Sequence, residues 1–178
     1  MKAKAFKPRL KSSRKTIMII LGIDPGTATT GFGIIRFEGG KFKVGSCGCV
    51  TTPAKQNQSK RLIHIFDSLD KIIKKEKPDC MAIEKLFFVN NVKTAMSVGE
   101  ARGVCLLAAE KNKVLVFEYT PLQVKQSLTG YGKAEKSQIQ MMVKLILKLK
   151  EVPKPDDMAD ALAIAITHAH CFRMKNYE

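Results

Sequence analysis

Several features that define other protein classes are missing from this chain of 178 residues. No apolar stretch approaches the ~20 residues of a membrane-crossing helix, so we expect no membrane-spanning segment. Residues 1–16 are too charged, and lack the long apolar core, for a secretory signal. None of the five cysteines forms a C-x-x-C pair, and no internal repeat or low-complexity block is present. These absences favour a globular protein with reduced thiols in the cytoplasm.

Acidic residues are the scarcer charge, with 16 Asp and Glu against 31 Lys and Arg and a formal net charge of +15. Residues 1–16 hold seven basic residues and no acid, which predicts a disordered basic tail before one folded domain at 17–178. That domain still holds 24 basic against 16 acidic residues. A basic domain favours nucleic acid or another anionic surface as the partner, although a lysine-rich soluble surface would give the same count.

Hydrophobic periodicity predicts an α/β domain. A continuous apolar run at 17–23 is typical of a strand buried on both faces, and two further strands are expected at 30–37 and 41–50, joined at Gly39-Gly40. The remaining pattern predicts strands at 79–84 and 114–119 and helices at 58–76, 91–112, 121–128, 135–149 and 156–171. Three antiparallel strands followed by strands that alternate with helices predict a mixed five-stranded sheet flanked by helices.

Four of the scarce acids stand at the ends of apolar segments. Asp24 ends the first predicted strand, and Glu84 ends the strand at 79–84. Asp157 and Asp160 open the final helix three residues apart, on the face that its apolar residues share. Because ligand sites gather at the carboxyl ends of strands, the four carboxylates converge if that helix packs across both strands. Hard oxygen ligands suit Mg²⁺ or Mn²⁺, and two such ions about 4 Å apart hydrolyse phosphodiesters.

A simpler explanation exists for these acids. Asp favours the first turn of a helix, where it caps the backbone and complements the dipole, and Asp156 after Pro155 fits that role. Acids at strand ends are also common surface residues. Two more acids on the core-facing side of the same helix exceed what capping needs, and gathered carboxylates repel one another unless a cation lies between them.

Residues near these acids indicate an anionic substrate. Lys133 and Lys136 follow a Gly130–Gly132 loop and could contact a phosphate, or could form a solvated helix start. Phe87-Phe88 follow the Glu84 strand, where they could belong to the core or stack on an unpaired base. The residues alone slightly favour the core for this pair.

A histidine-rich segment near the end of the chain resembles a zinc site at first glance. His168 and His170 point in different directions on a helix, and the sequence holds no second ligand pair to complete a site with them and Cys171. Ordinary helix residues are therefore favoured here.

Seven short motifs, in order along the chain, resemble the RuvC family of bacterial Holliday-junction resolvases. They are Gly22-Ile23-Asp24-Pro25-Gly26, Ala82-Ile83-Glu84, Gly99-Glu100-Ala101-Arg102-Gly103, Phe117-Glu118-Tyr119, Gln123-Val124-Lys125-Gln126, Ala134-Glu135-Lys136-Ser137-Gln138 and Asp157-Met158-Ala159-Asp160-Ala161-Leu162-Ala163. The similarity runs from about Ile17 to His170, and many motifs in register are more specific than any one of them.

The resemblance implies a ribonuclease-H-like fold and a homodimer that makes paired, symmetric, ligatable nicks across a four-way DNA junction in recombination and repair. It also implies two Mg²⁺ ions per active site, for which Mn²⁺ substitutes, and the RuvAB branch-migration complex as a partner. By motif match, the catalytic and metal-binding residues would be Asp24, Glu84, Asp157 and Asp160. Some family members have His where this chain has Asp157.

The motif match also assigns the residues that contact DNA. It gives Phe87 a junction-stacking role, which replaces the preference for the core, and assigns DNA contact to Lys125 and Lys136. The helix at 91–112 would lie at the dimer interface, which explains its many small residues. Family members begin near Met18, so residues 1–17 are expected to be a lineage-specific tail or an over-extended start.

Three other functions compete with this one. Asp24-x-Gly26-Thr27 resembles a phosphate loop of the actin and sugar-kinase class, but the chain is too short for two such domains and lacks a second glycine-rich motif. A second alternative is another ribonuclease-H-like nuclease, for example one that processes RNA, which would carry the same catalytic carboxylates. A junction-binding protein without catalysis is disfavoured by the intact carboxylate set.

Overall fold

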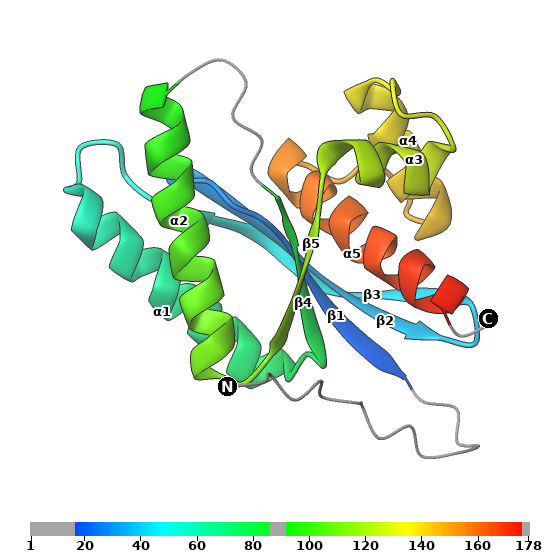
Figure 1. Ribbon diagram of the computed structural model, residues 1–178, viewed down its shortest axis with the longest axis horizontal. Helices are drawn as coiled ribbons and strands as arrows, with labels where there is room; N and C mark the ends of the chain where they lie inside the picture. Colours follow the sequence, from blue (N-terminus) through cyan, green and yellow to red (C-terminus); the bar gives the residue numbers. More distant parts are fainter. Residues whose placement is uncertain (1–16, 86–91, 176–178) are drawn as a thin grey trace, which may run out of the picture.

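One sheet and its covering helices make up the computed structural model of the chain, which describes residues 17–85 and 92–175 (Figure 1). The strands are β1 (Met18–Asp24), β2 (Thr29–Glu38), β3 (Lys41–Thr51), β4 (Cys80–Glu84) and β5 (Leu115–Tyr119). The helices are α1 (Gln58–Glu76), α2 (Val92–Lys111), α3 (Pro121–Thr129), α4 (Lys136–Ile146) and α5 (Asp156–Lys175). The tail predicted at 1–16 lies outside the described residues. None of the helices described is both long and apolar enough to cross a membrane.

The sheet is mixed and has the strand order β3-β2-β1-β4-β5. β1, β2 and β3 form an antiparallel meander, whereas β4 and β5 are added to β1 in the parallel sense. This arrangement confirms the mixed five-stranded sheet predicted from the strand and helix pattern. Because β1 and β4 are neighbours and parallel, their carboxyl ends meet at one edge of the sheet.

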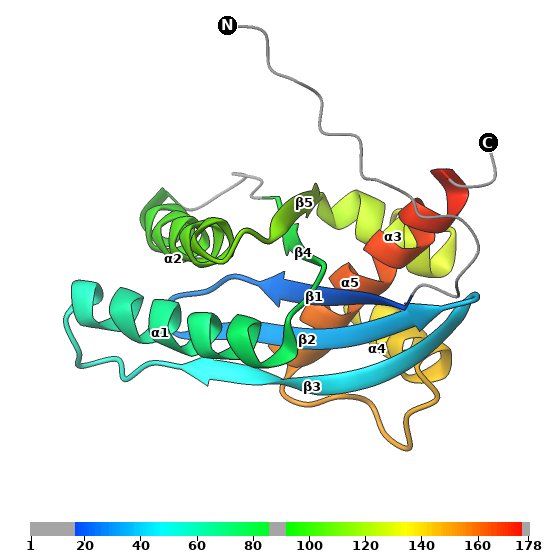
Figure 2. The same cartoon turned by 90° about the horizontal axis from the view of Figure 1, so that it is seen from below.

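Helices cover both faces of the sheet. α1 and α2 lie on one face, and α3, α4 and α5 lie on the other (Figure 1), while the view turned by 90° shows β1, β2 and β3 side by side (Figure 2). Alternate residues of β1 supply the two cores: Ile20 packs in the core on the α5 side, and Leu21 and Ile23 pack in the core against α1 and α2. A strand buried on both faces explains the continuous apolar run of β1.

Helix α5 lies unusually close to the sheet. A Cβ atom at Gly22 of β1 would overlap the carbonyl oxygen of Ala161, and one at Gly31 of β2 would overlap the carbonyl oxygen of Asp157. Glycine at these two positions therefore allows backbone to pack directly against backbone. The close approach brings the first turn of α5 to the strand end that carries Asp24.

Two predicted helix ends are wrong. The helix expected at 135–149 ends at Ile146, because Lys148 has a φ of 53°, which lies outside the right-handed helical region. The final helix was expected to end at residue 171 but continues to Lys175, since neither Gly nor Pro follows to stop it.

Candidate active site

Two of the four acids lie at the ends of adjacent strands. The parallel register pairs Ile23 with Ile83, so Asp24 and Glu84 are the next residues along β1 and β4. Side chains alternate along a strand, and Ile23 and Ile83 pack toward α1 and α2. Asp24 and Glu84 therefore face the opposite side, toward α5.

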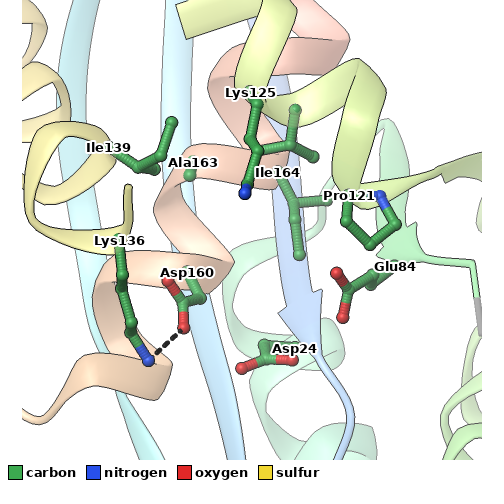
Figure 3. Close-up of a pocket in the computed structure, with 10 residues that line it drawn as sticks. Asp24, Glu84, Pro121, Lys125, Lys136, Ile139, Asp160, Ala163 and Ile164 are labelled. Carbon is green, nitrogen blue, oxygen red and sulfur yellow. Dashed lines mark ion pairs between the residues drawn. The ribbon is translucent and has the colours of Figure 1, made fainter. Parts of the chain in front are cut away.

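A pocket of about 230 Å³ opens where these strand ends meet α3, α4 and α5. Three carboxylates, two lysines and an apolar wall line it: Asp24, Glu84, Asp160, Lys125, Lys136, Pro121, Val124, Ile139, Ala163 and Ile164. Figure 3 shows the carboxylates of Asp24, Glu84 and Asp160 around one open space. Asp157 is half-buried and is not among these lining residues, but its charge acts on Asp24. The structure thus gathers three of the four acids in one pocket and places the fourth within electrostatic reach.

The pocket disfavours the charged forms of its own acids. Burial, followed by the charges of Glu84, Asp160 and Asp157, raises the pKa of Asp24 from 3.8 to about 7. Burial and then the charge of Asp160 raise the pKa of Glu84, and burial is also the main cause of the raised pKa of Asp160. A positive charge placed among these groups would stabilise all three as carboxylates.

Lys136, the first residue of α4, supplies part of that positive charge. Its Nζ lies 3.0 Å from Oδ2 of Asp160, the contact drawn as a dashed line in Figure 3, and 3.2 Å from Oδ2 of Asp156. Partial burial alone would lower the pKa of Lys136, but hydrogen bonds and charges from Asp160 and Asp156 raise it above its ordinary value. Lys136 therefore stays protonated and bridges two acids of α5 that are four residues apart.

The other residues assigned to DNA contact have different surroundings. Lys125 is half-buried on α3 and lines the same pocket as the carboxylates. Lys133 is exposed in the turn before α4 and is not among the lining residues. Phe87 lies outside the described residues.

The donor set of the pocket fits a divalent metal ion of the Mg²⁺ class. The donors are carboxylate oxygens, which such hard cations prefer, and the raised pKa of Asp24 marks negative charge that Lys136 does not compensate. Among residues 17–85 and 92–175, no three His, Cys, Asp or Glu side chains are already gathered closely enough to enclose one ion. The carboxylates line the pocket without closing on a common point.

Arg102 is a supporting residue whose role the sequence did not indicate. From α2, its Nε donates to the carbonyl oxygen of Glu84 at 3.3 Å, and its guanidinium forms an ion pair with Glu118 of β5. These contacts fix the end of β4 directly behind the Glu84 carboxylate. The only signal in the sequence was the position of Arg102 within the motif at 99–103 that resembles the RuvC family.

Hydrogen bonds donated by side chains also hold the segment that follows Asp24. The Thr27 hydroxyl donates to the carbonyl oxygen of Ser97 at 2.6 Å, and the Thr52 hydroxyl donates to that of Thr27 at 2.6 Å. Arg61 in turn donates to the Thr52 hydroxyl at 2.7 Å. The loop after β1 is thus tied to α2, to α1 and to the residue that follows β3, which positions Asp24 from its carboxyl side.

The histidines of α5 take part in packing contacts. His168 is buried, its Nδ1 lies 2.8 Å from the Tyr119 hydroxyl, and its ring packs against Phe117 with centroids 4.5 Å apart. Nδ1 of His170 lies 3.1 Å from the hydroxyl of Ser127. These contacts join α5 to β5 and α3, in agreement with ordinary helix residues.

Comparison with known proteins identifies the family. The family described as crossover junction endodeoxyribonuclease RuvC matches residues 20–168. The RuvC of Alkaliphilus oremlandii is 60% identical over 86% of this chain and 93% of its own length, and that of Ruminiclostridium cellulolyticum is 55% identical over 88% and 95%. The structure titled Thermus thermophilus RuvC in complex with Holliday junction substrate superposes with a TM-score of 0.85 at 38% identity, over 89% of this chain and 96% of that one.

These matches span nearly the whole described domain and confirm the ribonuclease-H-like fold expected from the motifs. They also exclude the actin and sugar-kinase class, since the matched family is a nuclease family. The chain belongs to the RuvC family of crossover junction endodeoxyribonucleases, the hydrolases that resolve Holliday junctions.

Proposed function

We propose that this chain cuts four-way DNA junctions by paired hydrolysis of phosphodiester bonds in the pocket lined by Asp24, Glu84 and Asp160, with Asp157 beside it. The observation that carries the proposal is the gathering of the Asp24, Glu84 and Asp160 carboxylates around one pocket, where they repel one another unless a cation lies between them. The junction bound by the Thermus thermophilus relative supports the substrate. The basic surface of the chain supports a polyanion in general.

The four carboxylates would hold divalent cations, Mg²⁺ in the first place and Mn²⁺ as a substitute, with two ions per site. Such a pair supplies an activated water and compensates the charge of the leaving oxygen. Around it, the half-buried Lys125 and the exposed Lys136 would bind the phosphate groups of the strand. The apolar wall of Val124, Ile139 and Ile164 would exclude bulk water and strengthen these contacts.

The proposal is tested with a junction whose homologous core branch-migrates, so that many sequences are presented for cutting. We expect nicks at symmetric positions in two strands of like polarity when Mg²⁺ is present, and little cutting of linear duplexes built from the same arms. Denaturing gels of end-labelled strands measure both. Equal cutting of the linear duplexes, or undiminished cutting in excess EDTA, would contradict the proposed function.

We further propose that the active enzyme is a homodimer assembled through α2. The small residues Ala101, Ala108 and Ala109 are buried in the protein's own core, so these three do not form an interface. Met96 and Leu107, by contrast, are 67% and 59% exposed on the outward face of α2. A Cβ atom at the exposed Gly103 between them would meet nothing within 4 Å, which leaves room for a second helix to approach.

A charge on that face should separate the subunits. In a symmetric interface, Leu107→Glu places two unpaired carboxylates at the contact, so we expect dimerisation to weaken by on the order of a hundredfold. Light scattering after gel filtration measures the mass over a dilution series. Leu145→Glu is the matched control, since Leu145 is 61% exposed on α4 and should not affect the dimer. An unchanged dimer in Leu107→Glu would place the interface elsewhere.

Other assignments stay proposals that follow from family membership. Phe87 would stack on bases at the opened junction, and Lys133 would contact the DNA backbone outside the pocket. The RuvAB branch-migration complex would deliver the junction. A basic tail at 1–16 would add nonspecific DNA affinity, with cytoplasmic DNA as the target.

A further inference from the structure

Lys136 has two acidic partners, and they differ in their surroundings. Asp160 is 30% exposed and lines the pocket with Asp24 and Glu84, whereas Asp156 is 57% exposed and lies outside it. Both are within 3.2 Å of the same ammonium group, because they stand four residues apart in the first turns of α5. The lysine therefore connects an acid of the site to an acid that takes no part in it.

The ion pair with Lys136 leaves Asp160 incompletely compensated. The one ammonium group is shared between two carboxylates, and Asp160 also lies around the pocket with the carboxylates of Asp24 and Glu84, whereas Asp156 lies outside it. A divalent cation among these three pocket carboxylates would therefore compensate the charge of Asp160 better than the shared lysine does. Asp156 needs no more than the lysine itself, since water solvates the rest of its charge.

We propose that Lys136 neutralises Asp160 in the metal-free protein, and that it shifts to Asp156 alone when a divalent cation takes Asp160. The inference rests on the proposed function, because it concerns the same metal site. Asp156 is then a positioning residue: it touches neither metal nor DNA, and it provides the alternative partner that makes release of Asp160 easy. Lys136 keeps its charge throughout and stays at the pocket rim, within reach of a phosphate.

The exchange predicts opposite effects for the two substitutions on metal affinity. Lys136→Met removes the competing cation, so Mn²⁺ should bind about three- to tenfold more tightly. Asp156→Asn removes the alternative partner, so Mn²⁺ should bind about two- to threefold more weakly. In the double variant, the loss of Asp156 should change the Mn²⁺ affinity little beyond the effect of Lys136→Met, because Asp156 no longer has Lys136 as an ion-pair partner. If each side chain acted only through its charge on the site, the effects of the two substitutions on Mn²⁺ affinity would instead be additive.

The experiment titrates Mn²⁺ into the DNA-free protein by electron paramagnetic resonance at one fixed, low ionic strength. The series comprises the unsubstituted protein, the two single variants, the double variant, and Lys133→Met as a matched loss of an exposed lysine. Melting temperatures in EDTA confirm that each protein is folded. Non-additive shifts, with Lys133→Met near the unsubstituted protein, support the exchange. Additive shifts of the two substitutions, or equal Mn²⁺ affinities in all five proteins, overturn the exchange alone. No Mn²⁺ binding to the unsubstituted protein overturns the proposed metal site as well.

Discussion

Asp24→Asn should lower the rate of junction nicking by about a thousandfold or more, while junction binding stays within a few-fold of the unsubstituted protein. Asp24 is the most perturbed acid of the pocket, and Glu84, Asp160 and Asp157 all act on it. A neutral amide of the same shape keeps the packing at the end of β1 but removes one negative donor. The loss should therefore fall on catalysis, since DNA binding depends on the basic residues.

Single-turnover cleavage in Mg²⁺ measures the first quantity, and a binding titration in Ca²⁺ or EDTA measures the second. Asp67→Asn is the matched control, because Asp67 is an exposed acid on α1 and should leave both quantities unchanged. Cleavage retained in Asp24→Asn would remove Asp24 from the catalytic set. An equal loss of binding and cleavage would instead indicate damage to the fold.

The sequence predicted the sheet well because its signals were local. The apolar run that ends at Asp24, and the turn at Gly39-Gly40, each depend on a few adjacent residues, and all five strands lie within one residue of their predicted bounds. The end of α4 was missed because the left-handed conformation of Lys148 has no glycine to mark it. Backbone hydrogen bonds from Lys148 to Leu145 and from Leu149 to Lys144 close this turn, and a single sequence does not reveal them.

The candidate site was only partly predictable for the same reason. The rule for carboxyl ends of strands brought Asp24 and Glu84 together, but the approach of α5 depends on Gly22 and Gly31, which meet that helix only in the folded chain. Lys136 was assigned to a phosphate, yet in the structure it is paired with Asp160 and Asp156. Its ion pairs join two helices whose packing the sequence does not specify.

Without metal at pH 8, the Asp24→Asn variant should be more stable than the unsubstituted protein, although the substitution removes a residue of the site. The folded state holds the Asp24 proton with a pKa of about 7, whereas an unfolded chain releases it near 3.8. This raised pKa contributes stability that is complete below pH 3.8 and is lost as the pH rises to about 7. Asn carries no such charge, so the variant avoids the loss.

The size of the effect follows from the shift in pKa. Three pKa units correspond to about 4 kcal/mol, and partial access of water to the pocket reduces this to about 2–3 kcal/mol. In a domain of this size, the melting temperature of the variant in EDTA should exceed that of the unsubstituted protein by about 5–10 °C at pH 8. The difference should shrink toward pH 5, where folded Asp24 is already protonated.

Adding Mg²⁺ at pH 8 separates this explanation from a general effect of Asn on the fold. A bound cation supplies the missing positive charge, so the unsubstituted protein should regain stability in proportion to its occupancy, while the variant should respond much less. Thermal melts in EDTA and in Mg²⁺, at pH 5 and pH 8, therefore form a complete set for each protein. A variant that is no more stable than the unsubstituted protein in EDTA at pH 8 would show that the Asp24 charge is already compensated, and the case for cations in this pocket would fail with it.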